Sequence, residues 1–208
     1  MNLSSLMSRG MARLGLPAAL GLLAVLVFLP GRSFLESSMV RHMLVQYPLL
    51  MLCGALLAGG LSAALADRAL GREVPASSWN AYGMTGLFGT ALGLALLMIP
   101  RVLDLALVNP WVECIKITIL VASGAAVYMS WRLAGWLVQG FFLGQVLPMM
   151  AVAGTLYESS PTRVCNAYLL NDQVLLGQLL VWIAAGIALA WVANLFRSLM
   201  RKSAIRAA

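Results

Sequence analysis

The sequence predicts an all-α protein, a polytopic membrane helix bundle of about six transmembrane helices. Hydrophobic residues make up 62% of the 208 residues and charged residues only 10%, whereas soluble domains carry roughly 25% charged residues. The mean hydropathy is +0.90. Long apolar stretches recur along the chain, and most of the loops between them are short, which is typical of spanning helices. We therefore expect residues 1–208 to form a single transmembrane domain without a soluble domain.

Six apolar stretches approach the length of about 20 residues that a spanning helix needs. They cover residues of about 15–30, 39–66, 81–99, 112–131, 134–157 and 174–196. Because no A-x-A-like cleavage site follows the first stretch, we expect it to be a retained span and not a signal peptide. Pro48 should kink the second stretch. The segment 101–111, where charges interrupt the apolar residues, is expected at the membrane interface.

The basic residues predict the orientation of the bundle. Nine of them lie on the side that both termini share, and five lie on the other side. The nine are Arg9, Arg13, Arg68, Arg72, Arg132, Arg197, Arg201, Lys202 and Arg206. The five are Arg32, Arg41, Arg101, Lys116 and Arg163. The positive-inside rule therefore predicts that both termini are cytoplasmic. With the acidic residues included, the net charge of +7 lies on this side. This asymmetry accounts for the charge without nucleic acid, and we expect the basic tail to meet membrane lipid head groups.

Glycines within the predicted spans are candidates for helix packing. Gly89 and Gly93 lie in the third span, and Gly140 and Gly144 lie in the fifth. Small residues let helix backbones approach closely in lipid, where no hydrophobic force drives helices together. We therefore expect these four positions to be helix contacts.

Few polar residues lie inside the predicted spans. Glu113 and Lys116 are three residues apart, a spacing that allows an ion pair on one helical face. The chain has one histidine, and neither H-E-x-x-H, G-x-S-x-G nor a phosphate-binding loop is present. These observations predict a protein that is not an enzyme. They also argue against a proton pump, which needs ionisable groups across the bilayer.

The three cysteines are spaced too far apart for a zinc motif. Cys53 lies inside the second span, where a small hydrophobic role is expected. Cys114 and Cys165 both fall on the outer side, where a disulfide between them is possible. Nothing in the sequence sets the distance between these two residues, so the unpaired alternative stays open.

The single histidine, His42, lies at the outer end of the second span. Met39 and Met43 share a helical face with it, because positions i, i+3 and i+4 align. Thioether and imidazole groups together suit the cuprous ion, so copper is a possible cofactor of this site. In the simpler interpretation, the methionines are flexible apolar residues and His42 is a polar residue at the membrane rim.

Two stretches of the sequence resemble the CtaG-type proteins, which are associated with assembly of cytochrome c oxidase. RHMLVQYPLLML (residues 41–52) is similar to a family helix that opens with a histidine and a methionine. NDQVLLGQLLVW (residues 171–182) is similar to a later helix that opens with Asp-Gln, and LYESSP (residues 156–161) is similar to the loop entry before it. Gln46 and Tyr47 occupy the region where the family usually carries a second histidine.

The resemblance implies an accessory protein of a bacterial inner membrane. Its role would be to assist assembly or copper loading of a respiratory or oxidative membrane enzyme, which would be its partner. The implied metal site combines His42, Met39 and Met43 with Asp172, although capping of the sixth span is the favoured role of Asp172. A second hypothesis is a structural subunit of a membrane redox complex with no metal of its own. A permease is less favoured, because no polar site is evident at mid-membrane.

Overall fold

The computed structural model describes the backbone of residues 3–28, 30–68 and 78–207, and the side chains of residues 15–28, 30–62 and 80–201. Helices and no strands are found in these ranges, which confirms the predicted all-α class. The α-helices are α1 (Leu3–Val27), α2 (Gly31–Glu36), α3 (Met39–Arg41), α4 (Tyr47–Arg68), α5 (Met84–Leu97), α6 (Pro100–Val108), α7 (Pro110–Trp131), α8 (Trp136–Ser159) and α9 (Leu170–Ala207). A π-helical turn, η1 (His42–Gln46), and a 3-10 segment, η2 (Ser78–Gly83), complete the set.

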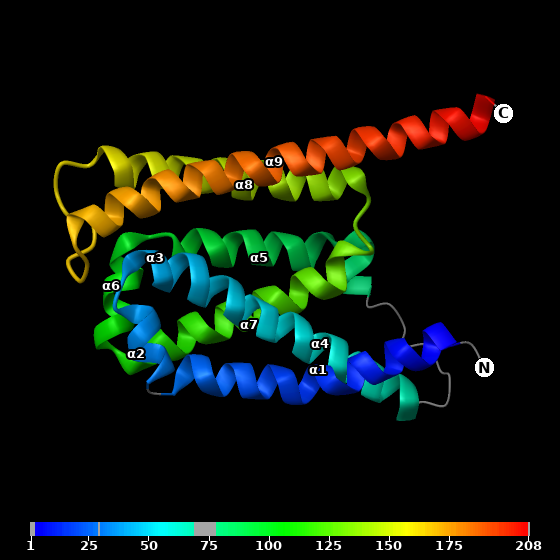
Figure 1. Ribbon diagram of the computed structural model, residues 1–208, viewed down its shortest axis with the longest axis horizontal. Helices are drawn as coiled ribbons and strands as arrows, with labels where there is room; N and C mark the ends of the chain where they lie inside the picture. The colour runs from blue at the N-terminus through cyan, green and yellow to red at the C-terminus, as the bar shows by residue number, and fades with distance from the viewer. Residues whose placement is uncertain (1–2, 29, 69–77, 208) are drawn as a thin grey trace.

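The chain runs back and forth between the two ends of an elongated bundle through α1, α4, α5, α7, α8 and α9 (Figure 1). One end, at the left of Figure 1, holds α2, α3, α6 and the connection between α8 and α9. We call this end, formed by residues 31–41, 100–108 and 160–169, the polar end. The helix α1 begins and α9 finishes at the opposite end.

Within the described residues, four helices are long and apolar enough to cross a membrane: Met39–Ser62, Pro110–Trp131, Trp136–Ser159 and Leu170–Arg201. The pair Asn80–Leu97 and Pro100–Val108 would make a fifth span, but it is bent by 76°. The bend falls where Ile99 precedes Pro100, and Ile99 has the extended ψ of 120° that a following proline favours. In α1 the apolar part Gly15–Val27 is shorter. By length and composition, the described residues thus support four or five of the six predicted spans.

Two pairs of helices pack closely through glycines. A Cβ atom at Gly54 would meet the Val121 carbonyl, and one at Gly124 would meet the Met51 carbonyl, so α4 and α7 touch backbone to backbone. Gly154 and Gly177 likewise bring the backbones of α8 and α9 into contact, because a Cβ atom at either glycine would meet the carbonyl of the other. Close approach of this kind is how helices associate in lipid.

The four glycines predicted to pack divide into two groups. A Cβ atom at Gly93 would lie 2.9 Å from Cγ2 of Ile119, and one at Gly140 would lie 3.0 Å from the Trp191 ring, so both face a neighbouring helix. Gly89 and Gly144 have nothing within 4 Å of such an atom. Gly89 and Gly144 therefore make no such close contact with the described residues, and their predicted role in helix packing stays a prediction.

The start of the second span departs from α-helical geometry. The π-helical turn η1 lies between the short α3 and α4, and Pro48 occupies the second position of α4. Proline lacks the amide hydrogen that an α-helix would use here, and π-helical turns often occur at functional sites. As a result, His42, Met43 and Gln46 of this turn all point into the bundle and are buried.

Candidate functional site

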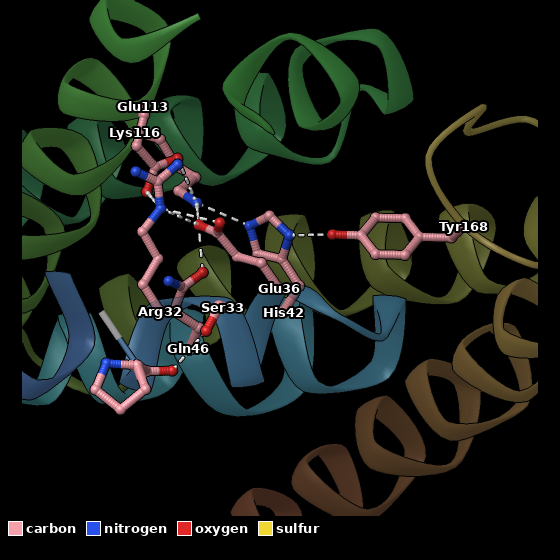
Figure 2. A network of polar contacts seen from close by, with 9 residues as sticks. Arg32, Ser33, Glu36, His42, Gln46, Glu113, Lys116 and Tyr168 are labelled. Carbon is pink, nitrogen blue, oxygen red and sulfur yellow. Dashed lines mark hydrogen bonds and ion pairs between the residues drawn. The ribbon is translucent and has the colours of Figure 1, made fainter. Parts of the chain in front are cut away.

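Seven polar side chains from four segments meet at the polar end (Figure 2). The helix α2 and the turn η1 contribute two each, as does α7, and the connection between α8 and α9 contributes one. We call this set the His42 network: Arg32, Glu36, His42, Gln46, Glu113, Lys116 and Tyr168. It joins segments that are far apart in the sequence.

His42 is completely buried, and both of its ring nitrogens have partners. Nδ1 lies 2.6 Å from Oη of Tyr168, and Nε2 lies 2.8 Å from Nζ of Lys116. An ammonium group only donates hydrogen bonds, so Nε2 of His42 accepts from Lys116. The proton of the neutral ring is then on Nδ1, which donates to the Tyr168 hydroxyl.

Lys116 is the centre of the charged part of the network. It is 1% exposed, and its ammonium group donates to His42 and also to Oε1 of Gln46 at 3.3 Å. It forms ion pairs with Oε2 of Glu113 at 2.7 Å and with Oε1 of Glu36 at 3.5 Å. The predicted pairing of Glu113 with Lys116 is thus confirmed. A buried cation is tolerated only when it is paired in this way.

Arg32 supplies the second positive charge. Its Nε donates to both carboxylate oxygens of Glu36, at 3.0 and 2.9 Å, and lies 3.9 Å from Oε1 of Glu113. Partial burial acts to lower the pKa of Arg32, but the hydrogen bond to Glu36 and the charge of Glu113 outweigh it and raise the pKa. The guanidinium of Arg32 and the ammonium of Lys116 therefore balance the carboxylates of Glu36 and Glu113. The network carries no net charge.

Some buried polar atoms beside His42 accept or donate no hydrogen bond within the described part of the chain. They are Nε2 of Gln46 and Oη of Tyr47, whereas the carboxylate oxygens of Glu113 are engaged by the ion pairs with Lys116 and Arg32. The Tyr47 ring packs edge-on against the His42 ring, with centroids 5.7 Å apart. Buried polar groups normally have a hydrogen-bond partner, so these atoms are sites where a buried water molecule could bind within the network.

Gln173 holds the connection that carries Tyr168. Its Oε1 accepts from the Val164 amide at 2.8 Å, and its Nε2 donates to the carbonyls of Tyr157 at 3.1 Å and Thr162 at 3.4 Å. These bonds tie the end of α8 and the start of α9 to the residues between them. Gln173 belongs to the NDQ stretch, and its buried side chain has a positioning role that sequence reasoning left unassigned.

Asp104 of α6 holds the same connection from the other side. Its carboxylate accepts from the amides of Asn166 at 2.9 Å and Ala167 at 3.4 Å. Cys165, next to them, is buried and donates to the Pro100 carbonyl through Sγ at 3.8 Å. Burial, together with the nearby charge of Asp104, raises the pKa of the Cys165 thiol to about 12. Tyr168 is therefore fixed by bonds on both sides of it.

The residues predicted to bind copper are not arranged as a metal site. Both nitrogens of His42 are occupied, and the ammonium of Lys116 beside Nε2 would repel a cation. Met39 and Met43 are buried in the apolar core, and Asp172 lies in the first turn of α9. In the described ranges no three His, Cys, Asp or Glu side chains come close enough to hold a metal ion. With both of its ring nitrogens bonded to protein side chains, His42 has no nitrogen free for a metal in this arrangement.

The possible disulfide between Cys114 and Cys165 is not formed in the structure. Cys114 is exposed on α7, whereas Cys165 is buried and its Sγ donates to the Pro100 carbonyl. Both cysteines are free, as is the buried Cys53. The shared outer side that motivated the pairing does not bring the two thiols together.

Sequence reasoning missed several members of the network. Arg32 was placed only among the basic residues of the side opposite the termini, and Glu36 was not singled out, although their spacing of four residues is the signal for a pair on one helix. Tyr168 carried no signal, because only the fold brings it to His42. Comparison with family models, with proteins of known function and with solved structures finds no match to the chain.

Proposed function

We propose that this chain is an accessory protein of a bacterial inner membrane that assists assembly of a respiratory or oxidative membrane enzyme and catalyses no reaction itself. One observation carries the proposal. The two stretches that resemble CtaG-type proteins contribute to the same place, because His42 of the first bonds to Tyr168 while Gln173 of the second holds the connection around Tyr168. Two motifs that converge on one end favour a shared function for that end.

In this proposal the polar end is the working surface. Both termini lie in the cytoplasm, so the polar end faces the periplasmic side, where it meets the client enzyme. The His42 network holds α2, η1, α7 and the α8–α9 connection together from the inside. A surface that is fixed from within loses little conformational entropy when a partner binds. The proposal assigns no metal to His42, since both of its nitrogens are engaged.

The proposal is tested by deleting the gene and returning it as the wild type, as Tyr168→Phe or as Tyr128→Phe. Tyr168→Phe removes the bond to His42, whereas Tyr128 is 47% exposed and serves as the matched control. We expect deletion to lower the assembled amount of one membrane redox enzyme, Tyr128→Phe to restore it fully, and Tyr168→Phe to restore it partly. Unchanged levels of every membrane redox enzyme after deletion would contradict the proposal.

A second candidate is a permanent structural subunit of a membrane redox complex. It is favoured by an apolar groove of about 450 Å³ between α8 and α9. Small residues line much of it: Gly140, Gly144, Ala151, Ala184, Ala185 and Ala188. Such a lining suits a helix of another subunit. Purification in mild detergent separates the two functions, because a subunit keeps a stoichiometric partner through gel filtration and an assembly factor does not.

A further inference from the structure

Gln145 differs from the other glutamines of the chain. The other four glutamines each have a partner for the side chain. Gln46 accepts from Lys116, and Gln139 donates to the carbonyls of Trp131 and Ala134. Gln173 bonds to the connection between α8 and α9, and Gln178 donates to Glu158. No hydrogen bond or ion pair joins Gln145 to any residue that the structure describes. Gln145 is an exposed residue.

This unpaired amide lies deep within a spanning helix. Gln145 follows Trp136, the first residue of α8, by nine positions, so it lies about 14 Å along the helix axis. The helix is 24 residues long, and it is one of those able to cross a membrane. Lipid tails offer an amide no hydrogen bond, and an unpaired polar group costs free energy at such a depth. A partner for Gln145 is therefore expected from outside the chain.

Gln145 lines a groove of about 660 Å³ between α5 and α8. Three aromatic side chains are among its walls, Phe88 of α5 with Phe141 and Phe142 of α8, and aliphatic side chains make up most of the rest. None of the described residues that line it is charged. Both helices begin at the end opposite the polar end, so the groove is distinct from the His42 network (Figure 1). It does not depend on the proposed function.

The lining points to a small molecule and not to a helix. A docking helix needs small residues, which line the α8–α9 groove and not this one. The volume lies within the range of about 300–1,000 Å³ typical of ligand sites, which combine apolar and aromatic walls with a few polar groups. Flat rings stack favourably on phenylalanine rings. The occupant must be uncharged, since nothing in the groove would balance a charge.

We propose that this groove binds a membrane-dissolved quinone, a neutral ring compound with carbonyl or hydroxyl groups, through the amide of Gln145. An amide both donates and accepts hydrogen bonds, so it pairs with the carbonyl of a quinone and with the hydroxyl of the reduced quinol. The phenylalanines enclose the ring, and the open side of the groove faces the lipid from which the compound enters. The groove contains no acid, base or redox group, so the site binds the quinone and does not convert it.

The test uses the full chain in lipid nanodiscs, titrated with decylubiquinone, with binding followed by calorimetry. Gln145→Leu is compared with the control Gln178→Leu. The control also removes a glutamine amide, but that amide bonds to Glu158 and does not line the groove. We expect saturable binding to the wild type and to Gln178→Leu, and binding about tenfold weaker for Gln145→Leu, as expected for one lost hydrogen bond. Thermal unfolding of each variant verifies that the fold is retained.

Two results would overturn the proposal. The first is the absence of saturable binding to the wild type, or equal affinities for Gln145→Leu and the wild type. The second is a disulfide-linked dimer that forms spontaneously in Gln145→Cys, with Cys53, Cys114 and Cys165 replaced by alanine. Such a dimer would mean that a second copy of the chain, through its own Gln145, occupies the groove.

Discussion

Nδ1 of His42 and Oη of Tyr168 lie 2.6 Å apart at the polar end, although 126 positions separate them in the sequence. The bond ties the connection between α8 and α9 to the start of the second span. His42 also bonds to Lys116 of α7 through its other nitrogen. One buried imidazole thus links three parts of the chain.

Tyr168→Phe should weaken the fold measurably. The change removes the hydroxyl that accepts from His42 and leaves a buried donor unpaired, which costs about 1–3 kcal/mol. For a chain of this size, a loss of 1 kcal/mol lowers the melting temperature by roughly 2–4 °C. Thermal unfolding in detergent measures the effect, with Tyr128→Phe as the control. Equal melting temperatures for the two variants would show that the bond contributes nothing.

Lys116→Met should destabilise the protein strongly. It leaves the carboxylates of Glu36 and Glu113 near each other with Arg32 as their remaining cation. Loss of one partner from a buried ion pair costs about 3–5 kcal/mol. The exposed Arg132 provides the control, because Arg132→Met removes a charge without burying one.

A rescue experiment makes the Lys116 prediction specific. The double variant Lys116→Met with Glu113→Gln removes the carboxylate that lies 2.7 Å from the ammonium. We expect it to recover part of the stability lost in Lys116→Met, since less charge is then buried unpaired. Additive losses from the two substitutions would mean that the two residues do not interact.

Gly124→Ala and Gly89→Ala should have opposite effects. A Cβ atom at Gly124 overlaps the Met51 carbonyl, so α4 and α7 must move apart at a cost of about 1–3 kcal/mol. At Gly89 nothing lies within 4 Å, and alanine is a better helix former than glycine by about 0.5–1 kcal/mol. Unfolding midpoints report both changes. A loss at Gly89 as large as that at Gly124 would be evidence against the packing of α4 on α7.

Thiol labelling should distinguish Cys114 from Cys165. N-ethylmaleimide should label the exposed Cys114 in the folded protein and reach Cys165 only after denaturation. Because the pKa of Cys165 is raised to about 12, its labelling should not increase as the pH rises from 7 to 10. Variants that keep one cysteine each allow the two to be measured separately. Rapid labelling of Cys165 in the folded state would contradict its burial.

The same pKa predicts a loss of stability at high pH. Folded Cys165 keeps a proton that the unfolded chain releases above a pH near its ordinary value of 9.0. The stability associated with this group is therefore complete below pH 9.0 and falls as the pH rises toward 12. Substitution of Cys165 by alanine should remove this part of the pH dependence.

Composition was sufficient to predict the class of this fold, and the spacing of Glu113 and Lys116 was sufficient to predict their ion pair. Both depend on local properties, namely apolar run length and the helical repeat. The contacts of Tyr168 depend instead on the tertiary arrangement, which no local pattern encodes. Gly89 and Gly124 illustrate the same limit, because a glycine in a span does not reveal which helix face it occupies.

His42 is the residue whose interpretation changed most. Its neighbours Met39 and Met43 predicted a soft-metal site by helical spacing, but Met39 and Met43 pack into the apolar core. The partners of His42 come from residues 116 and 168, and neither is a typical metal ligand. The sequence also did not reveal that a π-helical turn orients His42 inward.

The most direct test of the account is the copper content and Cu(I) affinity of the purified protein, compared between the wild type and His42→Ala. If His42 is held by Tyr168 and Lys116, both proteins should show the same negligible copper content and affinity, and His42→Ala should unfold at a lower temperature. A stoichiometric Cu(I) ion in the wild type that is lost in His42→Ala would contradict the account, because it would make His42 a metal ligand.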